Sequence, residues 1–252
     1  MAPARLAAVS RTVRGFLVLL ALLAASWSLV SRAAPAPGEV ERLAHLFDSV
    51  VFGSEIAGVA PATRVRKWAG DVRFKLGGPG AEAARQIVHR HASQLGTLTA
   101  LAYREIGARD PGENLVILIV PRAEMFEAGK HFEKNEVILR RIVEDARGHC
   151  YFLSYSQSER IVYAAIIANA ELERGKLTAC LLEEMTQVLG LPNDDPGLRQ
   201  PVSGYPVSPG GTGLAPAAEL MVRTLYDSRL KSGMDRAGAA AAARAVLGEL
   251  LK

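Results

Sequence analysis

The segment 176–194 constrains the fold of this chain more than any other stretch. Over residues 176–189, apolar and polar residues recur at helical spacing, and Gly190 followed by Pro192 is typical of a helix end. Five residues with polar or sulfur-containing side chains fall on one arc of this predicted helix: Lys176, Cys180, Glu183, Glu184 and Gln187. Periodicity alone therefore favours an amphipathic surface helix with a solvated polar stripe.

The acidic residues of this helix have a second interpretation. In a metal-hydrolase helix of the H-E-x-x-H type, two histidines four residues apart bind the metal and the glutamate between them is the general base. Here Glu183 and Gln187 stand at the histidine positions, and Glu184 stands at the general-base position. A carboxylate suits zinc, whereas an amide oxygen suits a harder ion such as calcium better. No cofactor is therefore predicted, although a divalent metal ion is compatible with the pattern.

The two adjacent glutamates also allow chemistry without a metal. Two carboxyl groups in one cleft can share a proton, because the pKa of one of them is raised by the charge of the other. The five histidines of the chain do not supply a zinc site: His89 and His91 are two residues apart and point apart on a helix, and the others are isolated.

The N-terminal residues predict export from the cytoplasm. Three arginines precede an apolar run over residues 15–30, and small residues follow it, which is the order of a secretory leader. We expect cleavage after Ala33, so that residues 1–33 form a signal peptide and the mature protein is periplasmic or secreted. The alternative is an uncleaved leader, with residues 15–30 as an anchor in the inner membrane.

The net charge argues against a nucleic-acid partner. The whole chain has a formal charge of +4, but four arginines and no acidic residue precede Glu39. Without the leader the protein is close to neutral, whereas phosphate binding needs a basic surface on the folded domain. The short basic cluster over residues 64–67 is better explained as a solvated strand edge or loop.

The chain has two cysteines, Cys150 and Cys180. In an oxidising compartment they predict a disulfide, and the alternative is two buried thiols. A bond between residues thirty apart would stabilise the fold by roughly 3–4 kcal/mol in the chain-entropy model.

The remaining pattern predicts one α+β domain over residues 39–252. Helical spacing is found in six segments: 40–51, 81–95, 135–145, 176–189, 217–225 and 237–251. Short apolar or alternating runs predict strands at the end of 64–76 and over 114–121, 150–155 and 161–168. A loop rich in glycine, proline and serine spans 192–216. We expect a small sheet that is mixed or antiparallel.

Three motifs in the second half of the chain together resemble a known family. They are E-E-x-x-Q over residues 183–187, L-G-L-x-N-D over 189–194, and L-Y-D with a following G-M pair over 225–234. This combination is similar to the secreted bacterial family described as domain of unknown function 2927, and the resemblance covers roughly residues 150–234. It implies a zincin-like fold, related to the metallopeptidases, in which E-E-x-x-Q replaces H-E-x-x-H.

The resemblance also implies roles for single residues. Glu183 and Gln187 would hold the two ligand positions and Glu184 the general-base position, while Asn193 and Asp194 would shape the turn that leaves the helix. The chain departs from the family pattern shortly before the L-Y-D motif. Ala218 stands where the family has an acidic residue, and the neighbouring Glu219 is the candidate substitute for it.

Three functions follow as hypotheses. The leading one is a degenerate metallopeptidase scaffold, inactive or altered in its chemistry, that binds a peptide or a cell-envelope component. The second is an active envelope hydrolase with Glu184 as its base. The third is an anchored, non-catalytic interaction protein whose glutamates are only a solvated stripe. Burial of Glu183 would argue against the third hypothesis.

Overall fold

Two strands rich in β-branched and small apolar residues form the centre of the sheet. β4 (Leu115–Val120) and β6 (Arg160–Asn169) are parallel neighbours that pair from Leu115–Ala164 to Val120–Asn169 in the computed structural model, which describes residues 38–54, 60–195 and 213–252. Most of their side chains are buried on both faces, as is usual for parallel strands that are covered on two sides.

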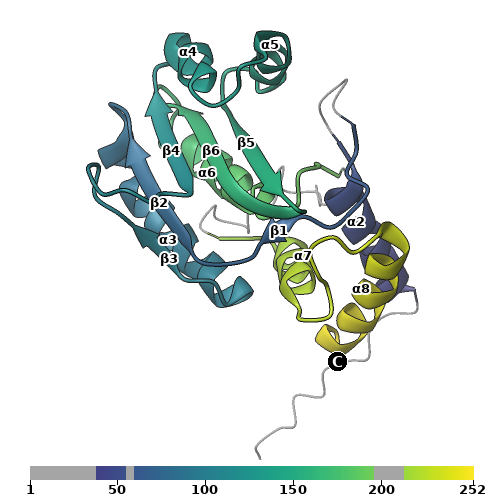
Figure 1. Cartoon of the computed structure of the whole chain (residues 1–252). Coiled ribbons are helices and arrows are strands. Elements are labelled where there is room, and N and C mark those ends of the chain that lie inside the picture. The colour runs from purple at the N-terminus through teal and green to yellow at the C-terminus, as the bar shows by residue number, and fades with distance from the viewer. Residues whose placement is uncertain (1–37, 55–59, 196–212) are drawn as a thin grey trace, which may run out of the picture. The chain divides into compact units, whose positions relative to one another are not determined.

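Six strands make up the sheet in the described residues. From one edge to the other the order is β5, β6, β4, β2 and β3, with β1 alongside the first residues of β6 (Figure 1). The remaining bounds are β1 (Lys67–Trp68), β2 (Val72–Gly77), β3 (Tyr103–Glu105) and β5 (Cys150–Gln157). Only β5 is antiparallel to its neighbour.

The sheet is therefore mixed, as one of the two expectations had it, and the antiparallel alternative is wrong. The connections from β2 to β3 and from β3 to β4 return the chain to the same end of the sheet, which makes these strands parallel. Only the tight turn between β5 and β6 produces a hairpin. Strand β3 was not predicted, because three residues are too few for a periodic signal.

Seven α-helices lie in the described part of the chain: α2 (Glu39–Phe52), α3 (Ala81–Thr99), α4 (Met125–Lys130), α5 (Glu136–Asp145), α6 (Arg174–Gln187), α7 (Pro216–Tyr226) and α8 (Arg236–Leu250). All six predicted helices are present within a few residues of the expected bounds. The short α4 and the 3-10 turn η2 (Arg122–Glu124) before it were not predicted. Part of the predicted loop, residues 196–212, lies outside the described residues.

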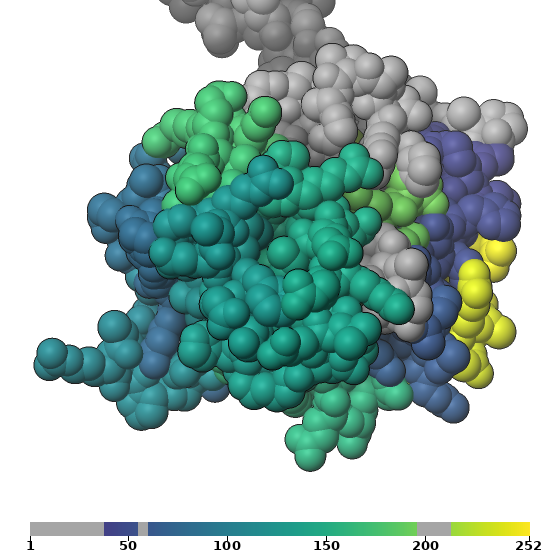
Figure 2. Space-filling view, turned by 90° about the horizontal axis from the view of Figure 1, so that it is seen from above, coloured from purple at the N-terminus to yellow at the C-terminus, as the bar shows by residue number. Residues whose placement is uncertain are grey.

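The two faces of the sheet are covered by different helices. On the first, which we call the α6 face, side chains from alternate positions of β4 and β6, such as Ile117 and Ile166, join a core with α2, α3, α6, α7 and α8. On the second, the α5 face, Ala165 and Ile167 of β6 pack in a smaller core with α4 and α5. From above, α4 and α5 occupy the middle of the surface, with α2 and α8 at its right (Figure 2).

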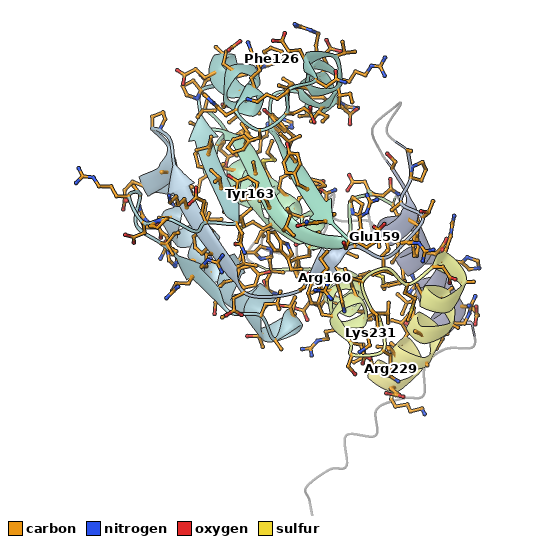
Figure 3. All side chains as sticks on the ribbon, viewed as in Figure 1. Phe126, Glu159, Arg160, Tyr163, Arg229 and Lys231 are labelled. Carbon is orange, nitrogen blue, oxygen red and sulfur yellow. A yellow bond between two sulfur atoms is a disulfide. The ribbon has the colours of Figure 1, made fainter. Side chains whose placement is uncertain are left out.

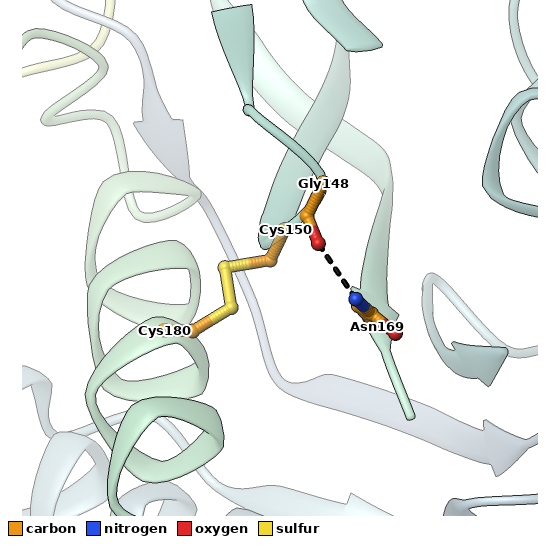
Figure 4. Close-up of a disulfide and its surroundings, with 4 residues drawn as sticks. All are labelled: Gly148, Cys150, Asn169 and Cys180. Carbon is orange, nitrogen blue, oxygen red and sulfur yellow. Dashed lines mark hydrogen bonds between the residues drawn. A yellow bond between two sulfur atoms is a disulfide. The ribbon is translucent and has the colours of Figure 1, made fainter. Parts of the chain in front are cut away.

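The predicted disulfide is present between Cys150 and Cys180. It joins the first residue of β5 to α6 across a Cα–Cα distance of 6.1 Å, which lies in the usual range (Figure 4). Close to it, the Asn169 side chain donates a hydrogen bond to the Gly148 carbonyl, at 2.7 Å. The end of β6 and the start of β5 are therefore tied to the helix that carries the E-E-x-x-Q motif.

The described residues 38–54, 60–195 and 213–251 pack as one compact unit. The predicted signal peptide and the alternative anchor at 15–30 lie outside the described residues, so cleavage and cellular location remain predictions. Among the helices that the structure describes, none is both long and apolar enough to cross a membrane.

Candidate functional site

Helix α6 is a buried helix, and the residues of its E-E-x-x-Q motif do not form a solvated stripe. Glu184 is 6 % exposed and Gln187 2 % exposed, while Glu183 is half-buried. The prediction of a surface helix with a solvated polar stripe, which periodicity favoured, is therefore wrong at these positions. The reason is tertiary: α6 contacts α3 on one side and the strands β5 and β6 on another, so that little of its circumference is left for solvent.

Gln187 orders the turn that follows α6. Its side-chain amide donates to the Asp194 carboxylate at 2.9 Å, and its backbone carbonyl accepts from the amide of Leu191 at 3.0 Å. A short-range bond of this kind holds the amide nitrogen at a fixed place. The amide of Gln187 therefore has a structural partner at the position where a metallopeptidase has a histidine ligand.

Asn193 fastens the same turn to helix α2. Its side chain donates to the Ser49 carbonyl at 3.1 Å, and its backbone amide donates to the carbonyl of Val50 at 3.3 Å. Gly53, just after α2, leaves room for this contact, because a Cβ at Gly53 would lie 2.3 Å from the Asn193 amide nitrogen. The end of α2 and the turn after α6 are therefore held together by these two hydrogen bonds.

Glu184 points toward the start of β5. It lines a small pocket of about 40 Å³ together with Asp145, Cys150 and Phe152. Within the described ranges, no three His, Cys, Asp or Glu side chains are grouped so that they could hold a metal ion. The pocket has room for about one or two water-sized molecules.

Glu219 lies at a different place from the E-E-x-x-Q motif. Its carboxylate accepts a hydrogen bond at 3.0 Å from the side chain of Gln94 on α3. It lines neither the small pocket nor the larger groove described below. The structure thus brings Glu184, Gln187, Asn193 and Asp194 into one region and leaves Glu219 on the α3 side of α7.

A buried histidine of α3 contacts α6, and the sequence analysis did not identify it as a site residue. His91 of α3 is 1 % exposed, and its Nε2 lies 3.1 Å from the Thr186 hydroxyl. That hydroxyl donates to the Leu182 carbonyl, so the ring donates from Nε2. Burial lowers the pKa of His91 to about 4, so the ring is neutral at pH 7. His89 lies on the exposed side of α3, as its spacing from His91 predicted.

A groove of about 340 Å³ runs beside β5, and we call it the β5 groove. Its wall on the α5 face includes Glu133, Ile138 and Ile142, and its opposite wall includes Val51, Gln187 and Gly190. Phe152, Leu153, Ser154 and Ser156 of β5 lie between these walls. Gln187 is therefore the residue of the E-E-x-x-Q motif that lines the groove, while Glu184 lines only the small pocket.

The edge of β5 that faces this groove is unpaired among the described residues. The amide of Asn169 donates to the His149 carbonyl, which sets the alternation of the ladder between β5 and β6. Tyr151 and Leu153 consequently direct their backbone groups toward β6, and Phe152 and Ser154 direct theirs toward the groove. The groove thus offers a short row of backbone donors and acceptors between two largely apolar walls.

An ion pair and a close backbone contact lie beside the carboxyl end of β5. Glu159 lies in the turn between β5 and β6 (Figure 3). Its carboxylate accepts a hydrogen bond from the Arg66 Nε at 2.8 Å. Gly190 has a φ of 111°, and a Cβ there would lie 1.9 Å from the carbonyl oxygen of Arg66. Only glycine allows the chain before β1 to pass so close to the end of α6.

The L-Y-D motif over residues 225–227 contributes hydrogen bonds to the segment that follows α6. The Tyr226 hydroxyl donates to the Leu189 carbonyl at 3.0 Å and accepts from the backbone amide of Trp68 at 3.2 Å. The Trp68 indole donates to the Val188 carbonyl at 3.0 Å. Two aromatic side chains thus satisfy the carbonyls of Val188 and Leu189, the two residues that follow α6.

The basic cluster 64–67 also has structural roles. Lys67 donates to the Leu225 carbonyl at 2.8 Å, and burial followed by the nearby charge of Lys231 lowers the pKa of Lys67 to about 8. Arg64 donates to the Gly233 carbonyl at 2.8 Å. These cations hold the chain before and within β1 against α7 and the loop after it.

The family of the chain follows from a comparison with protein-family models. The model described as "Protein of unknown function (DUF2927)" matches residues 40–245, so the chain belongs to this family. The match covers nearly the whole predicted domain, including the three motifs that suggested the resemblance. No curated protein and no solved structure matches the chain.

Proposed function

We propose that this protein is an exported, non-catalytic binding protein that holds an extended polypeptide segment in the β5 groove. The observation that carries the proposal is that the backbone edge at Phe152 and Ser154 faces the groove and has no strand partner within the described residues. An extended segment can add to such an edge as a further strand, with backbone hydrogen bonds supplying affinity and flanking pockets supplying specificity.

The contacts of Gln187 support a binding role over metal-dependent hydrolysis. In a helix of the H-E-x-x-H type, this position carries a metal ligand. Here the position holds an amide, whose oxygen is a poor ligand for zinc. Its nitrogen donates to Asp194, and the side chain is almost fully buried. The fold we propose is zincin-like, with α6 in the place of the metal-binding helix. In this proposal the end of α6 binds no catalytic metal and instead forms a wall of the groove.

The test is a pair of substitutions at Ser154, measured by fluorescence polarisation with labelled ten-residue peptides of extended conformation. Ser154→Pro removes a backbone N–H that points into the groove and leaves the ladder to β6 intact. We expect peptide affinity to fall about tenfold or more. The matched control, Ser154→Ala, keeps the N–H and should bind like the parent protein.

Thermal unfolding of both variants tells a lost contact from a lost fold. If Ser154→Pro is unfolded, the same question is answered from the ligand side, with peptides that are N-methylated at successive amides. Methylation at alternate positions should weaken binding. Affinity that is indifferent to every N-methyl group and to Ser154→Pro would overturn the proposal.

The hydrolase hypothesis remains as the second candidate because Glu184 lies close to the groove. Phe152 and Ile142 line both the groove and the small pocket of Glu184, so the two spaces share a wall. Stoichiometric zinc and a peptidase activity lost in both Glu183→Ala and Glu184→Gln would establish this alternative and exclude the binding function. We expect the purified protein to show neither.

A further inference from the structure

The two walls of the β5 groove determine what kind of segment fits, an inference that rests on the function proposed above. Ile138 and Ile142 of α5 form the wall on one face of the sheet. On the other face, the wall is formed by Val51 and Ile161, which are almost fully buried, and by the more exposed Ala62 and Pro192. A strand added at the edge of β5 would point its side chains alternately toward these two walls. Both sets of side chains would then meet apolar surface.

This arrangement differs from an ordinary open sheet edge. When a strand joins a sheet with one solvated face, its sequence alternates between apolar and polar residues. A strand that is covered on both faces has instead a continuous apolar run. The charged side chains of the groove lining are Arg66 and Glu133, and their charges have opposite signs. The lining therefore has no net charge with which to select an acidic or a basic ligand.

We infer that the β5 groove selects segments that are apolar on both faces, and that its partner is an exported polypeptide in a non-native state. Continuous apolar runs of strand type are central strands in folded proteins, where they are buried. They are accessible only before the partner folds or after it unfolds. The protein would act as a holding factor for such chains, and it would not recognise a surface motif of a folded partner.

The first test compares two peptides that differ only in pattern. One has a continuous run of Val, Ile and Leu between charged flanks, and the other replaces every second apolar residue by Ser or Thr. We expect the continuous peptide to bind about tenfold more tightly, because the alternating peptide places polar groups against one apolar wall. Equal affinities, both lost in Ser154→Pro, would overturn the selection rule and leave the proposed groove intact. Absence of binding by either peptide would overturn both.

The second test uses neighbouring residues of α5. Ile138 lines the groove, whereas Val137 is 65 % exposed and does not. Ile138→Ser should reduce the preference for the continuous peptide by roughly threefold to tenfold. Val137→Ser, the matched control, should leave it unchanged. An unchanged preference in Ile138→Ser would contradict the role of the α5 wall.

The partner class is tested with one protein in two states. Reduced and carboxymethylated lysozyme, which is permanently unfolded, should compete with the labelled continuous peptide. Native lysozyme should not compete at the same concentration. Competition by both forms or by neither would contradict selection of non-native chains.

Discussion

The two edges of the sheet are built in opposite ways. β3, at one edge, has three residues, and its Glu105 is paired with Arg85 and His89 of α3. β5, at the other edge, has eight residues and faces an apolar groove. Short strands and charged side chains are common means of preventing unwanted pairing at a sheet edge. The β3 edge is protected in this way, whereas the β5 edge keeps a surface on which another strand can pair.

The largest expected effect is a loss of stability on substitution of Gly190, which lines the β5 groove, compared with Gly112, which lies near the β3 edge. Gly190→Ala should destabilise the protein by about 3 kcal/mol or more, because it combines a left-handed backbone with a clash against the Arg66 carbonyl. Gly112→Ala, in the connection between β3 and β4, has a similar φ of 93° but no contact nearer than 3.8 Å. Its cost should be only about 1 kcal/mol. Chemical denaturation measures both, and equal costs would contradict the close approach at the groove end.

The disulfide should stabilise one edge more than the other. Replacing both cysteines, Cys150→Ser with Cys180→Ser, should cost roughly 3–4 kcal/mol of global stability. Hydrogen exchange should accelerate first in β5 and the first half of α6, with β3 following only the global change. Uniform acceleration at both edges would show that the bond does not act locally on the β5 edge.

The two histidines of α3 allow a test based on pH, because His91 is buried against α6 whereas His89 is exposed and paired with Glu105 at the β3 edge. His91, below α6, has a folded pKa of about 4, lower than its unfolded value, so its contribution is complete above pH 6.5. As the pH falls from 6.5 toward 4, the unfolded state takes up the proton first, and stability should drop by roughly 3 kcal/mol. Unfolding curves of His91→Gln should lack this loss. If His89→Gln removes it instead, the assignment to His91 is wrong.

The smallest effect is expected at the β3 edge. Burial raises the pKa of Glu105, but the hydrogen bonds and charges of Arg85 and His89 outweigh it, and the pKa is lowered. A lowered carboxyl pKa gives stability above the unfolded pKa that disappears as the pH falls through the folded pKa. Glu105→Gln should therefore cost about 1 kcal/mol at pH 7 and little at acidic pH. Peptide binding at the β5 groove should not change in this variant.

Most of the elements could be predicted because their signals are local. The helix over 176–189 has apolar spacing and a Gly–Pro end, and the β-branched run at 114–121 marks a central strand. β3 and α4 escaped prediction because three and six residues give no period. The parallel pairing depends on long connections, which local patterns do not encode.

The site was only partly predictable for a related reason. The motif identified Glu184, Gln187, Asn193 and Asp194 as neighbours, since they lie on one helix and its following turn. Burial of the E-E-x-x-Q residues depends on α3 and β5, which come from elsewhere in the chain. The groove itself is formed by α2, α5 and β5, and no single segment carries a signal for it.

The most direct test of the account is amide hydrogen exchange of β5, measured residue by residue with and without the continuous apolar peptide. In the free protein, the amides of Phe152 and Ser154 should exchange faster than those of Tyr151 and Leu153, which are bonded to β6. The peptide should protect Phe152 and Ser154 and leave the amides of β3 unchanged. Saturating peptide with no added protection at Phe152 and Ser154 would contradict the central claim that the β5 edge pairs with an added strand.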